Sequence, residues 1–209
     1  MARTLASSHD LLLGGRDGEV LGALAAELPN ARPWPVELTD PQALASAVAD
    51  VTSLDVLVHS AGIGTIGTLA DTSVRVWRDL MELNVVAVAE LTRLLLPALR
   101  AARGHVVLIN SGAGLRANPG WGAYAASKFA LRAFGDTLRA EEPNLRVTSV
   151  HPGRVATDMQ REVRAAEGGD YQPELYLRPE SVADAVVCAV SAPPDVHPTE
   201  LVIRPTGAG

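Results

Sequence analysis

The residues with the clearest potential for chemistry are Tyr124, Lys128 and Ser111, which lie in one segment of the chain. Tyr124 and Lys128 are four residues apart in a stretch with a helical pattern, so their side chains should lie one turn apart on the same face. An ammonium beside a phenol favours the phenolate and lowers the pKa of the phenol. We therefore expect Tyr124 to act as a general acid and base near neutral pH.

Lys128 stands out for a second reason. Of the 18 lysine and arginine residues in this chain, only Lys128 is a lysine. Arginine is a planar fork that stays protonated, whereas lysine is a compact charge with three rotatable donors, so the two are not interchangeable. The alternative interpretation is a solvated helix lysine four residues from a half-buried tyrosine.

The sequence Tyr-Ala-Ala-Ser-Lys at 124–128, with Ser111 thirteen positions before Tyr124 and just after an apolar run, resembles the active-site segment of the short-chain dehydrogenase/reductase family. The resemblance implies that Tyr124 is the acid and base, and that Ser111 hydrogen-bonds the carbonyl oxygen of the substrate. It also implies that Lys128 holds the nicotinamide ribose. Asn84 matches the asparagine of the family's four-residue constellation; the alternative is a helix asparagine that faces solvent.

Two further segments resemble parts of the family that hold the cofactor. His59-Ser60-Ala61-Gly62 is similar to the family's Asn-Asn-Ala-Gly turn, with both asparagines replaced, and residues 151–157 resemble the Pro-Gly segment that lies along the nicotinamide. The residues that the resemblance assigns to the cofactor are Ser60, Ala61, Gly62, Tyr124, Lys128, Pro152, Gly153, Val155 and Thr157.

The choice between NAD and NADP depends on the turn after the first predicted strand. An acidic residue there would bond the ribose hydroxyls of NAD, whereas an arginine accommodates the 2′-phosphate of NADP. This chain has two glycines and then Arg16, while Asp17 is better placed as a helix cap. Glu37 stands where the family often has an aspartate that contacts adenine. We therefore predict NADP, with Arg16 as a cofactor-binding residue.

Composition and charge exclude several classes of protein. The net charge of −6, without any block of basic residues, argues against nucleic acid as a partner. The apolar runs fall short of the ~18 residues of a membrane-spanning helix, and the N-terminus does not resemble a signal peptide, so we expect a cytoplasmic protein without a membrane partner. The single cysteine, Cys188, cannot form an intramolecular disulfide and lies in an apolar helical run, which predicts a buried structural residue.

Strand patterns alternate with helical patterns along the chain. Strands are predicted at 11–13, 34–38, 54–58, 105–110, 145–150 and 200–203. Helices are predicted to end near residue 9 and to cover 17–28, 40–50, 74–102, 122–141 and 179–190, while 157–178 is predicted to be a mobile lid. This alternation indicates an α/β fold: a Rossmann-like, doubly wound parallel sheet in a single domain that covers residues 1–209. The polar clusters follow the strands, where such sheets bind ligands.

The start of the chain departs from the family's pattern. The family opens with a strand and a Thr-Gly-x-x-x-Gly-x-Gly turn that binds pyrophosphate, and residues 1–6 align best with the end of the helix that follows that turn. The missing first strand would lie between the strands at Leu11 and Val56. We expect this sequence to be a truncated version of a longer protein.

The leading hypothesis is an NADP-dependent oxidoreductase that moves hydride between the cofactor and a small carbonyl or secondary alcohol. The alternative from another class is a catalytically silent Rossmann-like protein that binds a partner, because the phosphate-binding turn is absent. An epimerase-like relative would need a larger C-terminal region. The resemblance also implies a homodimer or homotetramer built on helices 74–102 and 121–141.

Overall fold

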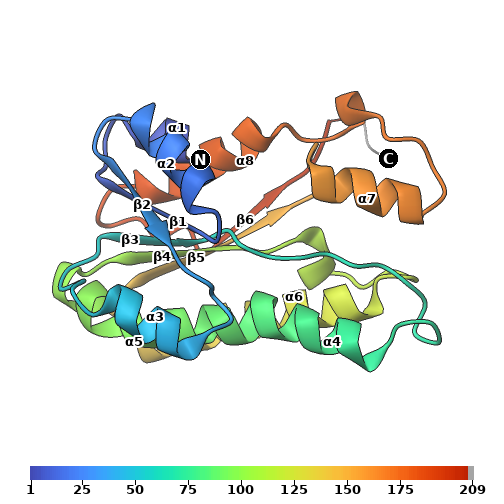
Figure 1. Ribbon diagram of the computed structural model, residues 1–209, viewed down its shortest axis with the longest axis horizontal. Coiled ribbons are helices and arrows are strands. Elements are labelled where there is room, and N and C mark those ends of the chain that lie inside the picture. The colour runs from blue at the N-terminus through green and yellow to red at the C-terminus, as the bar shows by residue number, and fades with distance from the viewer. Residues whose placement is uncertain (207–209) are drawn as a thin grey trace.

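The computed structural model describes residues 1–206 as parallel strands between two layers of helices (Figure 1). One pair of strands, β1 (Leu11–Gly15) and β2 (Ala31–Pro35), forms a two-stranded parallel sheet. A second, four-stranded parallel sheet has the order β3-β4-β5-β6, with β3 at Val56–His59, β4 at His105–Ile109, β5 at Arg146–Pro152 and β6 at Glu200–Ile203. This arrangement confirms the predicted α/β, Rossmann-like fold.

Helices lie on both faces of the four-stranded sheet (Figure 1). The described helices are α1 (Ala2–Leu5), α2 (Gly18–Ala26), α3 (Pro41–Val48), α4 (Val74–Met81), α5 (Ala87–Ala102), α6 (Gly122–Glu141), α7 (Asp158–Ala166) and α8 (Pro179–Val190), with a π-helical turn η1 (Glu82–Val86) and 3-10 turns η2 (Gly112–Gly114) and η3 (Pro173–Leu175). In Figure 1, α3, α4, α5 and α6 lie below this sheet, and α1, α7 and α8 lie above it. The helix α2 packs against β1 and β2 of the two-stranded sheet.

The core forms where the central strands are covered on both faces. Along β4, Val106 and Leu108 pack against the α5 and α6 side, while Val107 packs with Val150 and Val186 on the α8 side, and all five are fully buried. Strands that are buried on both faces need apolar residues at every position, and this is why β4 appears in the sequence as a continuous apolar run.

The predicted helix starts are confirmed where a side chain caps the backbone. The Asp17 carboxylate accepts hydrogen bonds from the amides of Glu19 and Val20, both at 3.0 Å, and Asp40 caps α3 in the same way, with Pro41 as the first helical residue. These caps depend on neighbouring residues alone, so the sequence suffices to locate them.

Several elements differ from the prediction, among them α1, which ends at Leu5 rather than near residue 9. The second strand is β2 at Ala31–Pro35 rather than 34–38; it pairs only with β1 among the described strands, and an edge tolerates prolines. The helix predicted over 74–102 is interrupted by the π-helical turn η1. Part of the predicted lid is the helix α7, whose buried residues Gln160 and Val163 anchor it, and Thr157 caps it.

The expectation for Cys188 was wrong. Its side chain is exposed on α8, because the buried residues of this helix, Val182, Val186 and Ala189 among them, lie on another face. Cys188 instead shares the solvent face with Asp184, one turn away. An apolar run alone does not show which face of a helix meets the sheet.

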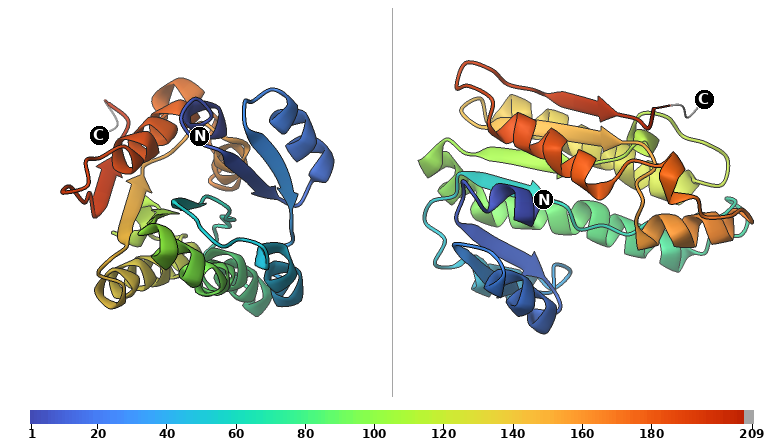
Figure 2. Two further views of the ribbon diagram at one scale, coloured as in Figure 1. Left: turned by 90° about the vertical axis from the view of Figure 1, so that its left-hand side faces the viewer. Right: turned by 90° about the horizontal axis from the view of Figure 1, so that it is seen from above.

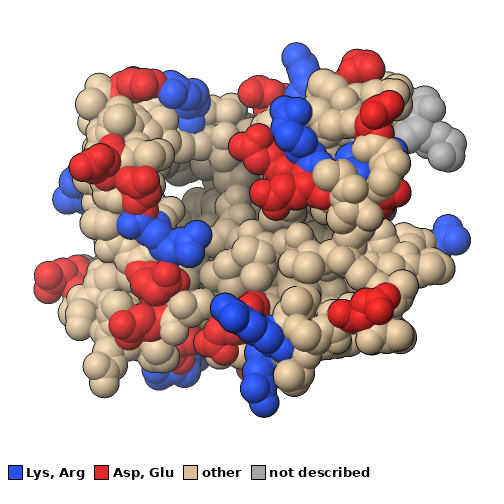
Figure 3. All heavy atoms as spheres, turned by 45° about the vertical axis from the view of Figure 1, so that its right-hand side comes forward, with Lys and Arg blue, Asp and Glu red and all other residues tan. Residues whose placement is uncertain are grey.

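The two sheets leave a gap where the sequence predicts a missing strand. Neither β1 nor β3 pairs with another described strand on the side that faces this gap, and the two sheets separate in both views of Figure 2. Val56, Leu57 and Val58 of β3 are only partly buried, in contrast to β4. The surface view in Figure 3 is hollowed near its centre, and acidic and basic side chains are interspersed around it.

Hydrogen exchange should distinguish the two edges of β3. The amide of His105 donates to the Asp55 carbonyl at 2.8 Å, so Leu57 also directs its backbone groups to β4, and Val56 and Val58 direct theirs to the gap. We expect the amides of Val56 and Val58 to exchange at least ~100-fold faster than that of Leu57, measured by nuclear magnetic resonance. Leu57 is the internal control, and equal protection of all three would show that the gap-facing amides have partners.

Candidate active site

A cavity of about 360 Å³ lies at the carboxyl ends of β3, β4 and β5. The residues that line it are Met1, Ser60, Ala61, Gly62, Ile63, Ile109, Asn110, Tyr124, Lys128, Pro152, Val155, Thr157, Met159, Pro179 and Val182. Parallel sheets bind ligands at this edge, since the loops that leave each strand meet there. Most of the residues predicted to bind a cofactor therefore come together in one place.

Tyr124 and Lys128 lie on consecutive turns of α6 and face this cavity, as their spacing predicts. Tyr124 is 8% exposed and Lys128 is 5% exposed. The ammonium nitrogen of Lys128 donates to the Ile109 carbonyl at 3.1 Å and lies 5.8 Å from the centre of the Tyr124 ring. The buried position of Lys128 rules out the interpretation as a solvated helix lysine.

The titration of the pair differs from the sequence-based expectation. Burial raises the pKa of Tyr124, while a hydrogen-bonding interaction with the Ser111 side chain acts in the opposite direction. Burial also lowers the pKa of Lys128 to about 8. The expected lowering of the Tyr124 pKa by Lys128 is therefore wrong for this structure, because the loss of solvent outweighs the interaction with Ser111.

Ser111 is placed by the end of β4 and by the turn that follows. Its amide donates to the Asn110 side-chain oxygen at 2.8 Å, and its hydroxyl accepts from the Ala113 amide at 3.1 Å. Because the hydroxyl oxygen already accepts this bond, its own proton is available to the Tyr124 phenol or to a ligand oxygen. Ser111 does not line the cavity, but its neighbour Asn110 does.

Asn84 is buried, with 1% of its surface exposed, so the alternative of a solvent-facing helix asparagine is excluded. Its side-chain oxygen accepts from the Ile63 amide, and its side-chain nitrogen donates to the Ile63 carbonyl and to the Ser127 hydroxyl, all at 3.0 Å. A Cβ on Gly62 would come within 3.0 Å of that oxygen, which explains the glycine. Asn84 thus ties the loop after β3 to α6.

Two predicted cofactor residues lie outside the cavity lining. Gly153 packs against Pro205 and Arg204, where a Cβ would come within 3.0 Å of the Pro205 ring. Arg16 directly follows β1 in the two-stranded sheet, and its charge acts on Glu37, whose pKa is lowered mainly by hydrogen bonds from Thr39. The structure therefore does not bring Arg16 into the cavity.

Several cavity residues carry no signal in the sequence. Met1, Met159, Pro179 and Val182 line it together with Ile63 and Ile109. Apolar residues in helices and strands are usually core, and only the packing of α8 and α7 over the sheet shows that these face a cavity. Their apolar surface suits a flat aromatic ring.

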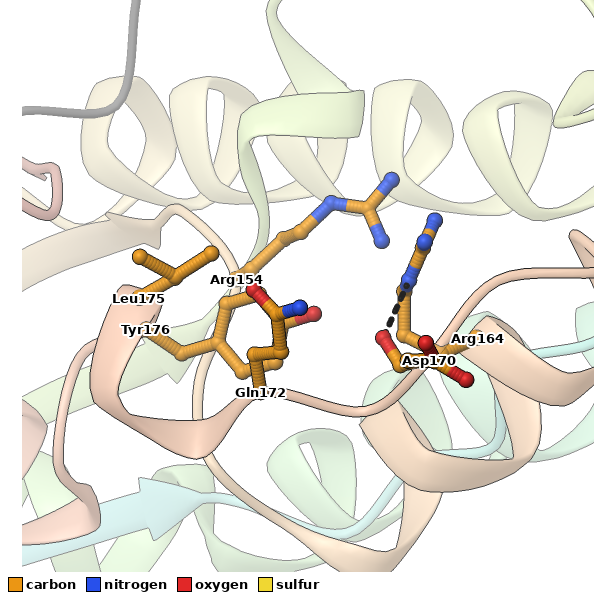
Figure 4. A pocket seen from close by; sticks show the side chains of 6 residues that line it. All are labelled: Arg154, Arg164, Asp170, Gln172, Leu175 and Tyr176. Carbon is orange, nitrogen blue, oxygen red and sulfur yellow. Dashed lines mark hydrogen bonds between the residues drawn. The ribbon is translucent and has the colours of Figure 1, made fainter.

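A second cavity of about 450 Å³ lies beside α7, lined by Arg154, Arg164, Asp170, Gln172, Leu175 and Tyr176 (Figure 4). Glu167 joins its two arginines: it pairs with Arg154 at 2.7 Å and with Arg164 at 2.6 Å. The Arg154 guanidinium also lies 5.7 Å from the Trp121 ring, which packs edge-on against Tyr124. This network ties α7, which is part of the predicted lid, to the segment that follows β5.

The cavity fits the nicotinamide half of a dinucleotide. Lys128 uses one of its three N–H donors on Ile109, which leaves two for ribose hydroxyls. Within residues 1–206, no group of side chains could hold a metal ion. No helix in the described part of the chain is long and apolar enough to span a bilayer.

Comparison with known proteins places these features in a family. The family described as short chain dehydrogenase matches residues 1–168, and the chain belongs to it. Dehydrogenase/reductase SDR family member 7B of Mus musculus is 38% identical over 181 residues, covering 79% of this chain and 56% of that protein. The Xenopus laevis protein of the same name is 38% identical over 207 residues, covering 88% of this chain and 64% of its own length. The chain thus spans less than two thirds of these relatives.

Solved structures with the same fold include two with a bound dinucleotide. An alcohol dehydrogenase from the archaeon Thermococcus sibiricus, complexed with 5-hydroxy-NADP, aligns with a TM-score of 0.88 at 26% identity and covers 98% of this chain and 90% of its own. The closed form of serine dehydrogenase with NADP+ aligns with a TM-score of 0.87 at 26% identity, covering 97% and 88%. The family is one of oxidoreductases that use a nicotinamide cofactor.

Proposed function

We propose that this protein is an NADP-dependent oxidoreductase that acts on a small carbonyl compound or secondary alcohol, with Tyr124 as the proton donor and acceptor. The observation that carries the proposal is the buried pair of Tyr124 and Lys128 beside Ser111, at the cavity formed by the carboxyl ends of the strands. The nicotinamide, when bound, supplies or accepts the hydride.

Each residue of the candidate active site has a distinct role in this proposal. Tyr124 donates its phenol proton to the carbonyl oxygen during reduction, and its raised pKa keeps that proton in place at neutral pH. Ser111 orients the same oxygen through its hydroxyl. Lys128 holds the ribose with its two free donors, and Asn84 fixes the loop formed by Ser60, Ala61 and Gly62. Pro152, Val155 and Thr157, which line the cavity, form the wall along the nicotinamide.

A second candidate function is a Rossmann-like protein that binds a partner without turnover. The gap between β1 and β3 favours it, since the two strands beside it lack a partner there among the described residues. An assay of NADPH oxidation with small aldehydes and ketones separates the two. Turnover supports the enzyme; intact fold with neither turnover nor binding of NADPH supports the second candidate.

The cofactor preference gives a sharper test. We propose that Arg16 binds the 2′-phosphate of NADP, because it follows β1 with two glycines and no acid before it, and it is exposed. Arg16→Ala should weaken NADPH binding by up to ~2 kcal/mol and leave NADH binding unchanged, measured by calorimetric titration of both cofactors. Arg32→Ala, which removes an exposed arginine from β2, is the matched control. Equal affinity of the unaltered protein for NADPH and NADH would contradict the proposal.

We propose a homodimer or homotetramer in which two copies associate through α6. Ala125 is buried inside the protein, but Ala126, Ala130 and Ala133 lie on the outer face beside Phe129, which is 41% exposed. Phe129→Glu should convert the assembly to a monomer in sedimentation velocity, because a charge replaces the apolar contact. Val20→Glu, at an exposed apolar residue of α2, should leave the mass unchanged. A monomeric unaltered protein would refute this assembly.

A further inference from the structure

His151, near the carboxyl end of β5, is a fully buried histidine next to the catalytic turn. Its ring nitrogen Nδ1 lies 3.1 Å from the carbonyl oxygen of Ser111. A carbonyl can only accept, so Nδ1 must carry the proton and donate. The neutral ring is therefore the Nδ1–H form, and its other nitrogen, Nε2, is a bare acceptor.

The rest of Ser111 is held by its own turn. The Ser111 amide donates to the Asn110 side chain, and the Ser111 hydroxyl accepts from the Ala113 amide. The Ser111 carbonyl accepts from the Gly114 amide at 3.0 Å, in addition to the bond from His151. Apart from the interaction with Tyr124, the described bond that reaches Ser111 from outside its own turn comes from the His151 side chain. It links the turn after β4 to β5.

The surroundings of His151 keep it in this one orientation. Arg204, which follows β6, donates to the His151 carbonyl at 2.7 Å. Nε2 has no hydrogen-bond partner and lies 3.9 Å from the Glu200 carboxylate of β6, which Arg132 of α6 pairs with at 3.1 Å. Burial lowers the pKa of His151, and the charges of Arg132 and Arg204 act in the same direction against the Ser111 carbonyl and Glu200, which favours the neutral ring. A neutral ring without solvent access cannot exchange its donor for water.

We propose that His151 is a positioning residue: by donating from Nδ1 to the Ser111 carbonyl, it holds in place the turn that presents the Ser111 hydroxyl to the active site. The effect of His151 on turnover rests on the proposed function. Its effect on the Tyr124 phenol does not, because that can be measured without any cofactor or substrate.

Two substitutions distinguish the effect of losing the hydrogen-bond donor from the effect of losing the imidazole ring. His151→Asn keeps an amide that can donate from a position close to that of Nδ1, whereas His151→Leu keeps volume and burial but has no donor. The readout is the pKa of Tyr124, followed by the ultraviolet absorbance of tyrosinate and assigned with Tyr124→Phe. The direction of the change is decisive. Losing the Ser111 interaction raises the pKa of Tyr124, but general loosening would hydrate the phenol and lower it.

We expect the pKa of Tyr124 to rise in His151→Leu and to stay at its original position in His151→Asn. A fall in both variants would show a merely structural residue and overturn the proposal. If His151→Leu does not fold, the chemical shifts of the His151 ring nitrogens in the unaltered protein decide alone: the Nδ1–H form supports the proposal, and the Nε2–H form overturns it.

Where turnover is present, His151→Leu should lower kcat roughly tenfold with little change in KM, and His151→Asn should restore kcat. If turnover is absent but the pKa of Tyr124 changes as expected, the proposed function is refuted, and the positioning role of His151 is not.

Discussion

Replacement of Tyr124 by phenylalanine is expected to lower kcat/KM for carbonyl reduction by about 10²- to 10⁴-fold, the usual contribution of a general acid. The phenol oxygen is the group that would transfer the proton, and no other phenol lines the cavity. The ring itself remains, so its edge-on contact with Trp121 and its packing in the core are preserved. Initial rates of NADPH oxidation measure the change.

The control for Tyr124→Phe is Tyr171→Phe, which removes a phenol oxygen from the segment after α7, where the ring packs against Arg161. This control should keep its activity. Both variants should unfold within a few degrees of the unaltered protein, since neither change removes buried apolar surface. A Tyr124→Phe variant that retains most of its activity would disprove the role of Tyr124.

The pH dependence of carbonyl reduction and of alcohol oxidation follows from the ionisation of the Tyr124 phenol. Burial raises the pKa of Tyr124, so the phenol is protonated throughout the neutral range and loses its proton only above that raised pKa. Reduction needs the phenol and should stay level across neutral pH, then fall at high pH. Oxidation needs the phenolate and should increase as the pH rises. The same rate assay in both directions measures this, as part of the test of Tyr124.

Lys128→Arg should lower kcat/KM by ~100-fold or more, although it keeps the positive charge. The Lys128 side chain is 5% exposed, with Gly62 and the backbone of Ile109 close to its ammonium, so the longer planar guanidinium has no room to reach the ribose in the same geometry. Measurement of kcat/KM and of the dissociation constant for NADPH should show both effects, because the lysine binds the cofactor in our proposal.

The matched control for Lys128 is Arg132→Lys, the reverse exchange one turn further along α6. Arg132 is partly exposed and pairs with Glu200 at 3.1 Å, and such pairs are worth little at the surface. It should leave activity unchanged. An active Lys128→Arg variant, with an affinity for NADPH equal to that of the unaltered protein, would rule out the role of Lys128 as a point charge at the ribose.

The sequence alone determined the features that depend on local spacing. The caps at Asp17 and Asp40 need only the amides two and three residues later, and the shared face of Tyr124 and Lys128 needs only the pitch of a helix. The alternation of strands and helices set the α/β class, and it placed the polar loops at one edge of the sheet, where Ser60 and Pro152 now line the same cavity.

The tertiary structure decided everything that depends on burial and on partners distant in the chain. The pKa of Tyr124 is raised rather than lowered, because solvent exclusion by the surrounding fold outweighs the interaction with Ser111. Asn84 turns inward at a π-helical turn to bond Ile63, and Cys188 faces solvent because α8 presents another face to the sheet. None of these follows from neighbouring residues, since packing between segments far apart in the sequence sets which side of a helix is buried.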